Sequence, residues 1–332
     1  MPTQTTELVE TGAPVHPIIA STAVGRVVVL GGTGFIGSAV VRHLEGEADV
    51  VVVGRGGRAP GPVNHGTRFL AADLSDAAAV ESVLAGADSV VYSVAAMLPA
   101  ESTASPVQDV THSLTPLLHV LEHLRHHPTT RLVFLSSGGT VYGNPDSIPV
   151  HESHATRPTS SYGVLKLAAE KYIQMYATVY GIDARVLRVA NAYGPRQPLG
   201  RSQGVVGTFI DAALHDRPLQ IFGTGRAVRD YIHVDDVALA VQAALRTDGP
   251  EVVNVATGIG TSLVDIVAQV EQLSGSTLRI EMLPERPFDV HAIVLDASAF
   301  RAMVGVEPVP FQEGLTATFE VAKADHDAKR TR

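Results

Sequence analysis

The sequence has no cysteine and no tryptophan among its 332 residues. Without cysteine, disulfides, thiol nucleophiles and thiolate metal sites are excluded. No apolar run approaches the ~20 residues of a membrane-spanning helix. The formal net charge of −9, without a long basic run, argues against a nucleic-acid partner. Residues 1–25 lack the features of a signal peptide, so we expect a flexible tail there and a cytoplasmic protein.

Metal binding is also not expected, although four histidines fall within nine residues. His119, His123, His126 and His127 have helical spacings of three and four, which could bring imidazoles together around a metal. No cluster of carboxylates accompanies them. We therefore predict that they form a solvated helix end.

Hydrophobic residues make up 45% of the chain, enough for a substantial core. Valine-rich runs such as 27–30 and 50–53 show no polar alternation, which is typical of parallel strands buried on both faces. Helical stretches separate such runs up to about residue 195. This alternation predicts an α/β protein with a doubly wound parallel sheet over 26–195, to which 234–257 returns. A smaller C-terminal α/β lobe is expected over 196–233 and 258–320, followed by a tail over 321–332.

A glycine-rich turn follows the first of these strands. Gly31, Gly34 and Gly37 are three residues apart and precede a predicted helix over 38–44. Small residues at this spacing let a pyrophosphate approach the backbone N–H groups of the helix start, as in Rossmann dinucleotide sites. The predicted cofactor contacts in this turn are Gly31, Thr33, Gly34, Phe35, Ile36 and Gly37.

The segment after the second strand bears on the choice of cofactor. NAD sites have an acidic residue there that accepts hydrogen bonds from the ribose hydroxyls. This chain has Arg55 and Arg58 instead, and guanidinium groups suit the 2′-phosphate of NADP. NADP(H) is therefore favoured, and NAD remains possible if the arginines are merely solvated. Further predicted cofactor contacts, at the ends of the third and fourth strands, are Asp73, Leu74, Ala95 and Ala96.

Asp73 has a second interpretation. It precedes a predicted helix over 75–84, and an aspartate in that place is equally ordinary as a helix cap.

Tyr162 and Lys166 lie four residues apart at the start of a helix predicted to run to about Tyr180, so they share one face. An ammonium beside a phenol favours the phenolate, which could exchange a proton with a substrate oxygen. Ser137 and Thr140 follow the fifth strand, at the sheet edge where open α/β sheets bind ligands. These four residues are the candidate catalytic groups.

Taken in order, these stretches resemble the extended short-chain dehydrogenase/reductase family that acts on nucleotide sugars. That family includes the UDP-glucose 4-epimerases and the reductases of 4-keto-6-deoxyhexoses. The similarity runs from about Val27 to about Leu315. Its later markers are Arg188, Asn191, Gly194, Pro195, the stretch 229–235, Arg286 and Asp289.

The resemblance implies that Tyr162 transfers the proton and that Lys166 lowers its pKa and binds the cofactor ribose. It implies that Asn191, Arg229 and Arg286 hold the sugar diphosphate in the second lobe. For the two arginines the alternative is a salt bridge with a neighbouring aspartate. The resemblance also implies a homodimer formed by the helices near 107–127 and 162–180.

Two positions depart from patterns within the family. Gly138 stands where many epimerases have a catalytic serine or threonine, so that either Ser137 or Thr140 serves the substrate oxygen or Tyr162 acts with less help. Gly139 and Thr140 stand where the 4,6-dehydratases carry an Asp–Glu pair. Dehydration is therefore not expected.

Three functions remain. The arginines after the second strand favour NADPH-dependent reduction of the C4 ketone of a nucleotide-linked 4-keto-6-deoxyhexose, with dTDP as the expected carrier. The alternative is an NAD-dependent 4-epimerase of the UDP-glucose type, which would use the same residues because both reactions pass through a 4-keto sugar. A non-catalytic nucleotide-binding sensor is the third, and the intact Tyr162–Lys166 pair argues against it.

Overall fold

The computed structural model describes residues 24–56, 67–94, 97, 99–199, 204–249, 251–285 and 290–330. Four predicted contacts lie outside the described residues: Arg58, Ala95, Ala96 and Arg286. The predicted tail before residue 24 lies outside them as well.

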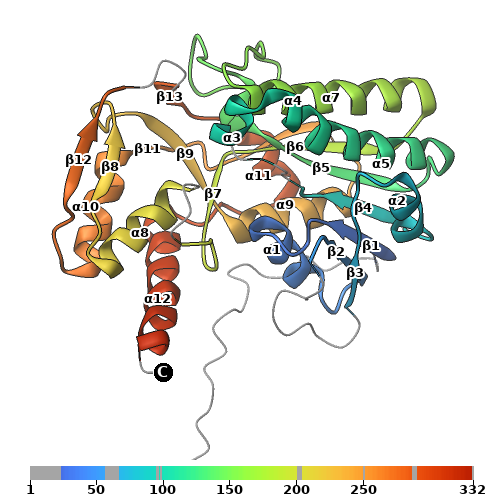
Figure 1. Ribbon diagram of the computed structural model, residues 1–332. Coiled ribbons are helices and arrows are strands. Elements are labelled where there is room, and N and C mark those ends of the chain that lie inside the picture. Colours follow the sequence, from blue (N-terminus) through green and yellow to red (C-terminus); the bar gives the residue numbers. More distant parts are fainter. Residues whose placement is uncertain are drawn as a thin grey trace, which may run out of the picture.

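The main sheet of the described chain is parallel and seven-stranded. Its strands are β1 (Arg26–Leu30), β2 (Asp49–Gly54), β3 (Arg68–Ala71), β4 (Ser89–Tyr92), β5 (Arg131–Ser137), β6 (Ala184–Val189) and β10 (Val252–Val255). They lie in the order β10-β6-β5-β4-β1-β2-β3 (Figure 1). This order confirms the predicted doubly wound sheet. Along the chain, the strand order changes direction between β1 and β4. In a sheet of this kind a ligand binds at the carboxyl ends of the two strands at such a point.

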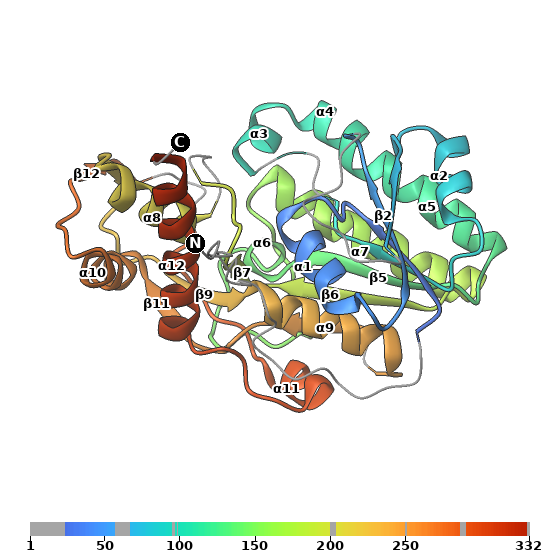
Figure 2. The same ribbon diagram turned by 90° about the horizontal axis from the view of Figure 1, so that it is seen from below.

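Helices cover both faces of the sheet, because each strand buries its two alternating sets of side chains. In β1, Val27 and Val29 join the core on one face, and Val28 and Leu30 join the core on the other. The first face carries α1 (Phe35–Leu44), α9 (Val234–Arg246) and α11 (Ser298–Val304), the first two of which lie in front of the sheet in Figure 2. The second face carries α2 (Ala77–Leu84), α5 (Thr115–His126) and α7 (Ser161–Tyr180).

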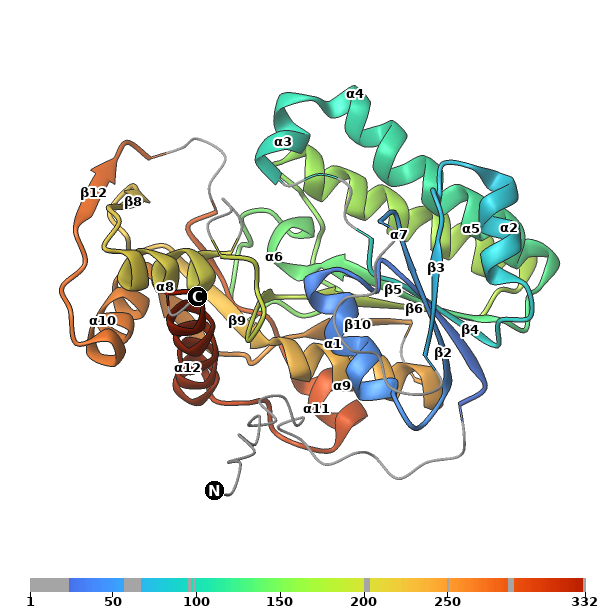
Figure 3. The ribbon, with the colours of Figure 1, turned by 60° about the horizontal axis from the view of Figure 1, so that its bottom comes forward.

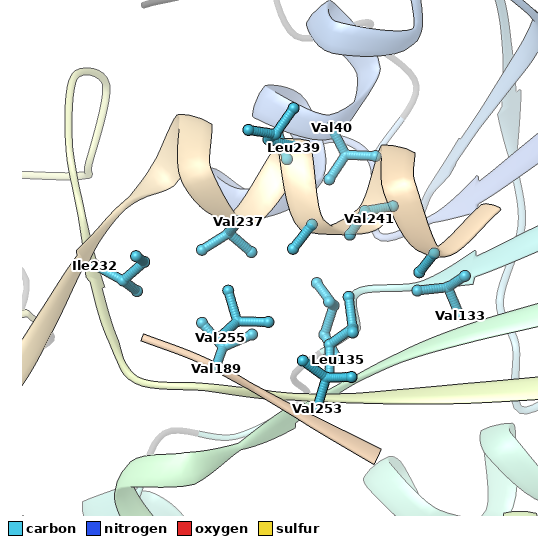
Figure 4. Packing of buried hydrophobic residues seen from close by; sticks show 14 of the residues in the cluster. Val40, Val133, Leu135, Val189, Ile232, Val237, Leu239, Val241, Val253 and Val255 are labelled. Carbon is cyan, nitrogen blue, oxygen red and sulfur yellow. The ribbon is translucent and has the colours of Figure 1, made fainter. Parts of the chain in front are cut away.

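Helix α9 is buried on all sides, because it packs on β5, β6 and β10 and is flanked by α1 and α11. Val237 and Val241 point at sheet residues such as Leu135 and Val255 (Figure 4). The helix begins at Val234, and the ring Nδ1 of His233 accepts a hydrogen bond from the N–H of Asp235 at 3.3 Å.

The segment between β4 and α5 contains α3 (Pro99–Ala104), α4 (Pro106–Asp109) and a π-helix, η1 (Val110–Leu114). Pro116 lies in the first turn of α5, directly after this wide turn. Proline has no N–H to continue the helical ladder, so the preceding turn adopts a different hydrogen-bond pattern. Asp109 is the last residue of α4 and directly precedes the π-helix.

The second lobe has its own core of apolar side chains. Its elements are β7 (Asn191–Tyr193), α8 (Val205–His215), β8 (Leu219–Phe222), β9 (Val228–His233), β11 (Gly260–Ser262), α10 (Leu263–Ser274), β12 (Ile280–Leu283), β13 (Ala292–Ile293) and α12 (Phe311–Arg330). Strand β9 pairs with β7, β11 and β13 and leads directly into α9.

The predicted C-terminal tail over 321–332 was wrong as far as residue 330, because α12 continues to Arg330. Leu315, Phe319 and Ala322 recur on one helical face and are buried. That face packs against α8 and α10 (Figure 3). The tertiary contact therefore extends the helix into a stretch whose charged composition suggested a tail.

Candidate active site

The glycine turn between β1 and α1 is fixed by close packing. Gly31 has φ +78°, and its N–H donates to the carbonyl oxygen of Val53 at 2.9 Å. A Cβ on Gly37 would collide with the carbonyl oxygen of Gly31 and with Ser93, whose hydroxyl donates to Leu30 at 2.8 Å. Only glycine therefore allows β1, α1 and the end of β4 to meet so closely.

The start of α1 fits an anionic group. Gly34 is the N-cap residue, so no side-chain oxygen occupies the first N–H groups, and the first turn contains no acidic residue. Those N–H groups and the positive end of the helix dipole face the crevice at the carboxyl end of β1. The described turn therefore fits the pyrophosphate of a dinucleotide.

Arg55 follows β2 and Asp73 follows β3 at the same edge of the sheet, and both are exposed. Asp73 accepts hydrogen bonds from the N–H and hydroxyl of Ser75 at 3.0 and 2.6 Å, which hold the pKa of its carboxyl below the usual range. Its interpretation as a helix cap was wrong: α2 begins at Ala77 and is capped by Asp76. Arg55 contributes to the same lowering of the Asp73 pKa through its charge.

Helix α7 carries the Tyr162–Lys166 pair, and both ends of the helix are capped. Ser160 accepts a hydrogen bond from the N–H of Gly163 at 3.2 Å, and Gly181 ends the helix at φ +72°. The ammonium of Lys166 donates to the carbonyl oxygen of Leu135, in β5, at 2.9 Å. It lies 5.8 Å from the centre of the Tyr162 ring. The two side chains therefore share one face beside the end of β5.

Burial changes the protonation of this pair. It raises the pKa of Tyr162 to about 12, and the carboxylate of Asp109 adds to the rise. It lowers the pKa of Lys166 to about 8. The sequence predicted a tyrosine pKa lowered by the lysine, and the shift has the opposite direction because desolvation outweighs the charge of a lysine at this distance. Burial thus favours the neutral phenol, so that formation of the phenolate depends on positive charge beside it.

The turn after β5 explains the departure at Gly138. This residue begins α6 (Gly138–Val141), and a Cβ on it would meet the side chain of Leu295 and lie 2.9 Å from the carbonyl oxygen of Arg188. A serine or threonine has no room here. The neighbouring Ser137 and Thr140 are half-buried, and the Thr140 hydroxyl is 3.5 Å from the carbonyl oxygen of Ser137.

Two of the predicted substrate contacts lie where the lobes meet. Asn191 donates to the carbonyl oxygen of Asp230 at 3.1 Å and also lies next to Gly139. Arg229, in β9, is half-buried, and its guanidinium donates to the carbonyl oxygen of Val228 at 2.9 Å. The Asp230 carboxylate is buried and accepts hydrogen bonds from Thr257, Gly258 and Leu295.

Sequence reasoning missed a buried network behind the catalytic helix. Glu170, one turn after Lys166, forms an ion pair with Arg188 of β6 at 2.7 Å and accepts from the hydroxyl of Ser136. Arg188 also donates to the hydroxyl of Tyr142 at 2.9 Å. The sequence marked Arg188 through the resemblance alone, and no local pattern indicates its partners. The network fixes α7 to the strands whose ends line the site.

A hollow in the second lobe was also missed. It is lined by residues 222–227, Glu285, Val290 and His291. It adjoins β8 and β9, and the sequence analysis assigned no role to its glycine-rich wall at 223–225.

The match to a family model decides the classification. The model of the NAD dependent epimerase/dehydratase family matches residues 27–256. The chain belongs to this family.

Relatives in the family cover nearly the whole chain. A putative UDP-glucose 4-epimerase of Methanocaldococcus jannaschii is 33% identical over 87% of this chain and 95% of its own length. The UDP-glucose 4-epimerase of Thermus thermophilus, solved in complex with NAD, is 33% identical over 89% of this chain and 98% of that chain, with a TM-score of 0.83. That of Thermotoga maritima, solved with UDP-glucose, is 32% identical over 90% and 99%, with a TM-score of 0.85.

A reductase is also among the relatives, at lower similarity. The dTDP-4-dehydro-6-deoxyglucose reductase of Escherichia coli is 28% identical over 66% of this chain and 69% of its own length. The epimerases thus match more of the chain than this reductase does. The function left as the alternative by the sequence is therefore better supported than the favoured one.

Within the described residues, no helix is long and apolar enough to cross a membrane. The same part of the chain contains no group of three or more His, Asp or Glu side chains arranged to hold a metal ion.

Proposed function

We propose that this protein is an NAD-dependent nucleotide-sugar 4-epimerase of the UDP-glucose type. The observation that carries the proposal is the similarity to UDP-glucose 4-epimerases through both lobes, with 98–99% of the solved epimerase chains covered. The substrate lobe is therefore matched along with the dinucleotide-binding half. The intact Tyr162–Lys166 pair beside the end of β5 provides the proton-transfer group that such a reaction needs.

In this reaction Tyr162 exchanges a proton with the oxygen at C4 of the sugar. NAD held along the start of α1 would supply the hydride acceptor and donor for C4. Tyr162 accepts the hydroxyl proton as the ketone forms and gives it back on reduction. Lys166 holds positive charge near the phenol, which favours the phenolate during the first half of the cycle. Ser137 or Thr140 donates a hydrogen bond to the same oxygen.

We infer that the sugar diphosphate lies between the lobes. Arg229 and Asn191 flank that region, and guanidinium groups bind phosphate oxygens through charge-assisted hydrogen bonds. Arg286 would be a further phosphate ligand. The hollow beside residues 222–227 is the site we assign to the nucleotide base.

A second candidate, NADPH-dependent reduction of a 4-keto-6-deoxyhexose, is favoured by Arg55. Its position near Asp73, at the adenosine end of the crevice, would suit the 2′-phosphate of NADP. The NAD-bound relative argues for the epimerase. The two candidates therefore differ in cofactor and in whether reducing equivalents are consumed.

The deciding experiment examines the protein as purified. The protein is denatured, the released nucleotide is identified, and intact protein is incubated with UDP-glucose alone. Stoichiometric NAD and formation of UDP-galactose without added cofactor support the epimerase. The opposite result has three parts: no NAD is retained, UDP-glucose is unchanged, and NADPH is oxidised only when a 4-keto sugar is present. That result would replace the epimerase proposal with the reductase.

We also propose that the protein is a homodimer paired through α7. Val164, Tyr172, Met175 and Val179 are exposed, and their positions fall within an arc of about 80° on the helix. An exposed apolar stripe of this kind is typical of an interface between helices.

A further inference from the structure

A small, partly open cavity lies beside Tyr162 and Lys166, between α7, the η1 segment and the strands β4 and β5. Its volume is about 30 Å³, enough for one water molecule. Apolar side chains form much of its wall. The polar residues that line it are Tyr92, Asp109, Ser113, Tyr162 and Lys166.

Asp109 stands out among these residues because its side chain is buried, with 1% of its surface exposed. The hydroxyl of Ser113, one turn later, donates to its Oδ1 atom. Its Oδ2 atom finds no hydrogen-bond partner among the described residues, and neither does the buried hydroxyl of Tyr92. Burial of a carboxylate is costly unless a charge or a donor compensates it.

The balance of buried charge identifies the compensating group. Glu170 also lies near Lys166, but it forms a close ion pair with Arg188. The charge of Glu170 is therefore shared between Arg188 and Lys166. Asp109 is the second carboxylate whose charge acts on Lys166, and it lines the same cavity.

We propose that Asp109 is the counter-ion of Lys166 and acts as a positioning residue for the Tyr162–Lys166 pair. Ser113 holds one carboxylate oxygen, so the other is left for the cavity. A water molecule there would bridge Asp109 to Tyr92 and to the ammonium. The π-helix that follows Asp109 sets the helical face on which Asp109 and Ser113 meet the cavity.

The groups that face Lys166 come from every element packed against it. On α7 they are Tyr162 and Glu170, and β5 contributes the carbonyl oxygen of Leu135. Tyr92 of β4 and Asp109 complete the set. Burial lowers the pKa of Lys166, and the carboxylates of Glu170 and Asp109 oppose this. Removing the charge of Asp109 should therefore let Lys166 lose its proton at lower pH.

Lysine titration tests this directly, because the sequence has four lysines: Lys166, Lys171, Lys323 and Lys329. The full-length protein is labelled at the lysine ε-carbon, the Lys166 signal is assigned with Lys166→Arg, and each signal is followed by NMR across pH. We expect Lys166 to titrate near pH 8 in the unaltered protein. In Asp109→Asn the midpoint should fall by about one pH unit or more, with the other three lysines unchanged.

Ser113→Ala is the matched variant, since it removes the hydrogen bond and keeps the charge. It should leave the Lys166 midpoint within a few tenths of a pH unit. Equal shifts in both variants, or no shift in Asp109→Asn, would overturn the proposal. If Asp109→Asn does not fold, Asp109→Glu takes its place: retention of the midpoint supports the charge role, and a fall of about one pH unit opposes it.

Only the catalytic consequence rests on the proposed function. If Asp109 positions the pair for epimerisation, the alkaline limb of the kcat profile should move to lower pH in Asp109→Asn, and KM should change little. A shifted lysine titration in a protein that does not interconvert UDP-sugars would leave the counter-ion assignment standing and reject the epimerase.

Discussion

Lys166 donates a hydrogen bond from its ammonium to the carbonyl oxygen of Leu135 at 2.9 Å, joining the catalytic helix to the central strand beside it. The same ammonium lies 4.9 Å from the centre of the Phe134 ring. A buried lysine held in this way carries charge into an apolar region. Holding the lysine at this position therefore lowers the free energy of unfolding.

Lys166 should make stability depend on pH in a defined window. Its pKa falls from 10.5 to about 8 on folding because of burial. Between these two pKa values the unfolded chain holds the proton and the folded chain has lost it, so the free energy of unfolding rises with pH. Below pH 8 the lysine is charged in both states, and the full cost of burying its charge remains. The free energy of unfolding of the unaltered protein relative to Lys166→Met should accordingly rise from pH 8 to pH 10. Urea titrations measure the difference, and a flat difference contradicts the assigned shift.

Tyr162→Phe should abolish most turnover while leaving the fold intact. The phenol donates and accepts the proton in the proposed reaction, and a positioned acid–base group contributes on the order of 10²–10⁴-fold to rate. We expect a fall in kcat within that range, with unfolding midpoints near those of the unaltered protein. Conversion of UDP-glucose to UDP-galactose at the original rate would remove Tyr162 from the mechanism.

Gly138 and Gly139 should respond differently to alanine. A Cβ at Gly138 lies 2.9 Å from the carbonyl oxygen of Arg188, whereas at Gly139 the nearest atoms belong to Asn191 at 3.7 Å or more. Gly138→Ala should cost about 1–3 kcal/mol of unfolding free energy through overpacking, and Gly139→Ala should be neutral or slightly stabilising. Thermal and urea unfolding of the two variants provide the comparison. Equal stability would mean that the turn after β5 has more room than the structure shows.

Arg188 should be far more sensitive than an exposed arginine. Arg188→Met leaves Glu170 buried without its cation, which should cost about 3–5 kcal/mol. The control is Arg157→Met, because the pair of Arg157 with Asp146 is exposed and its loss should cost less than about 1 kcal/mol. Adding Glu170→Met to Arg188→Met should restore part of the loss. If the double variant is less stable than Arg188→Met, the uncompensated charge is not the source of the cost.

Val179 tests the proposed dimer. It is 61% exposed at the end of α7, on the same stripe as Met175. Val179→Glu would place a charge in the interface and should shift sedimentation from dimer to monomer, whereas the change of exposed Gln174 to glutamate, Gln174→Glu, about 80° outside the stripe, should not. A monomeric unaltered protein, or a dimer that survives Val179→Glu, argues for another arrangement.

The strands could be predicted because the residues that favour each strand lie within that strand. The runs of valine in β1 and β2 need burial on both faces whatever surrounds them, and Ser160 and Gly181 mark the ends of α7. The same holds for the glycine turn, whose spacing is tied to one strand and one helix. Fold class, the glycine turn before α1 and the shared helical face of Tyr162 and Lys166 could therefore be predicted from the sequence.

Features that depend on distant segments were not predictable. The complete burial of α9 follows from its packing against the sheet, α1 and α11, and the reach of α12 follows from packing on α8 and α10. The raised pKa of Tyr162 depends on burial, which four-residue spacing cannot reveal. The choice of epimerase over reductase came from similarity along the chain, since the residue types of the site serve both reactions.

Strand β10 occupies the edge of the main sheet beside β6, and α9, which directly precedes it in the regular structure, covers β5, β6 and β10 beside α1. The chain thus enters the second lobe, returns to the first through α9 and β10, leaves again, and returns once more through α11 before α12. A fragment ending near residue 195 would lose α9, α11 and β10, and α1 would be left to cover that face of the sheet. Exchange of the substrate lobe between relatives therefore requires three separate grafts, one before α9, one between β10 and α11, and one after α11, with both return segments kept from the recipient.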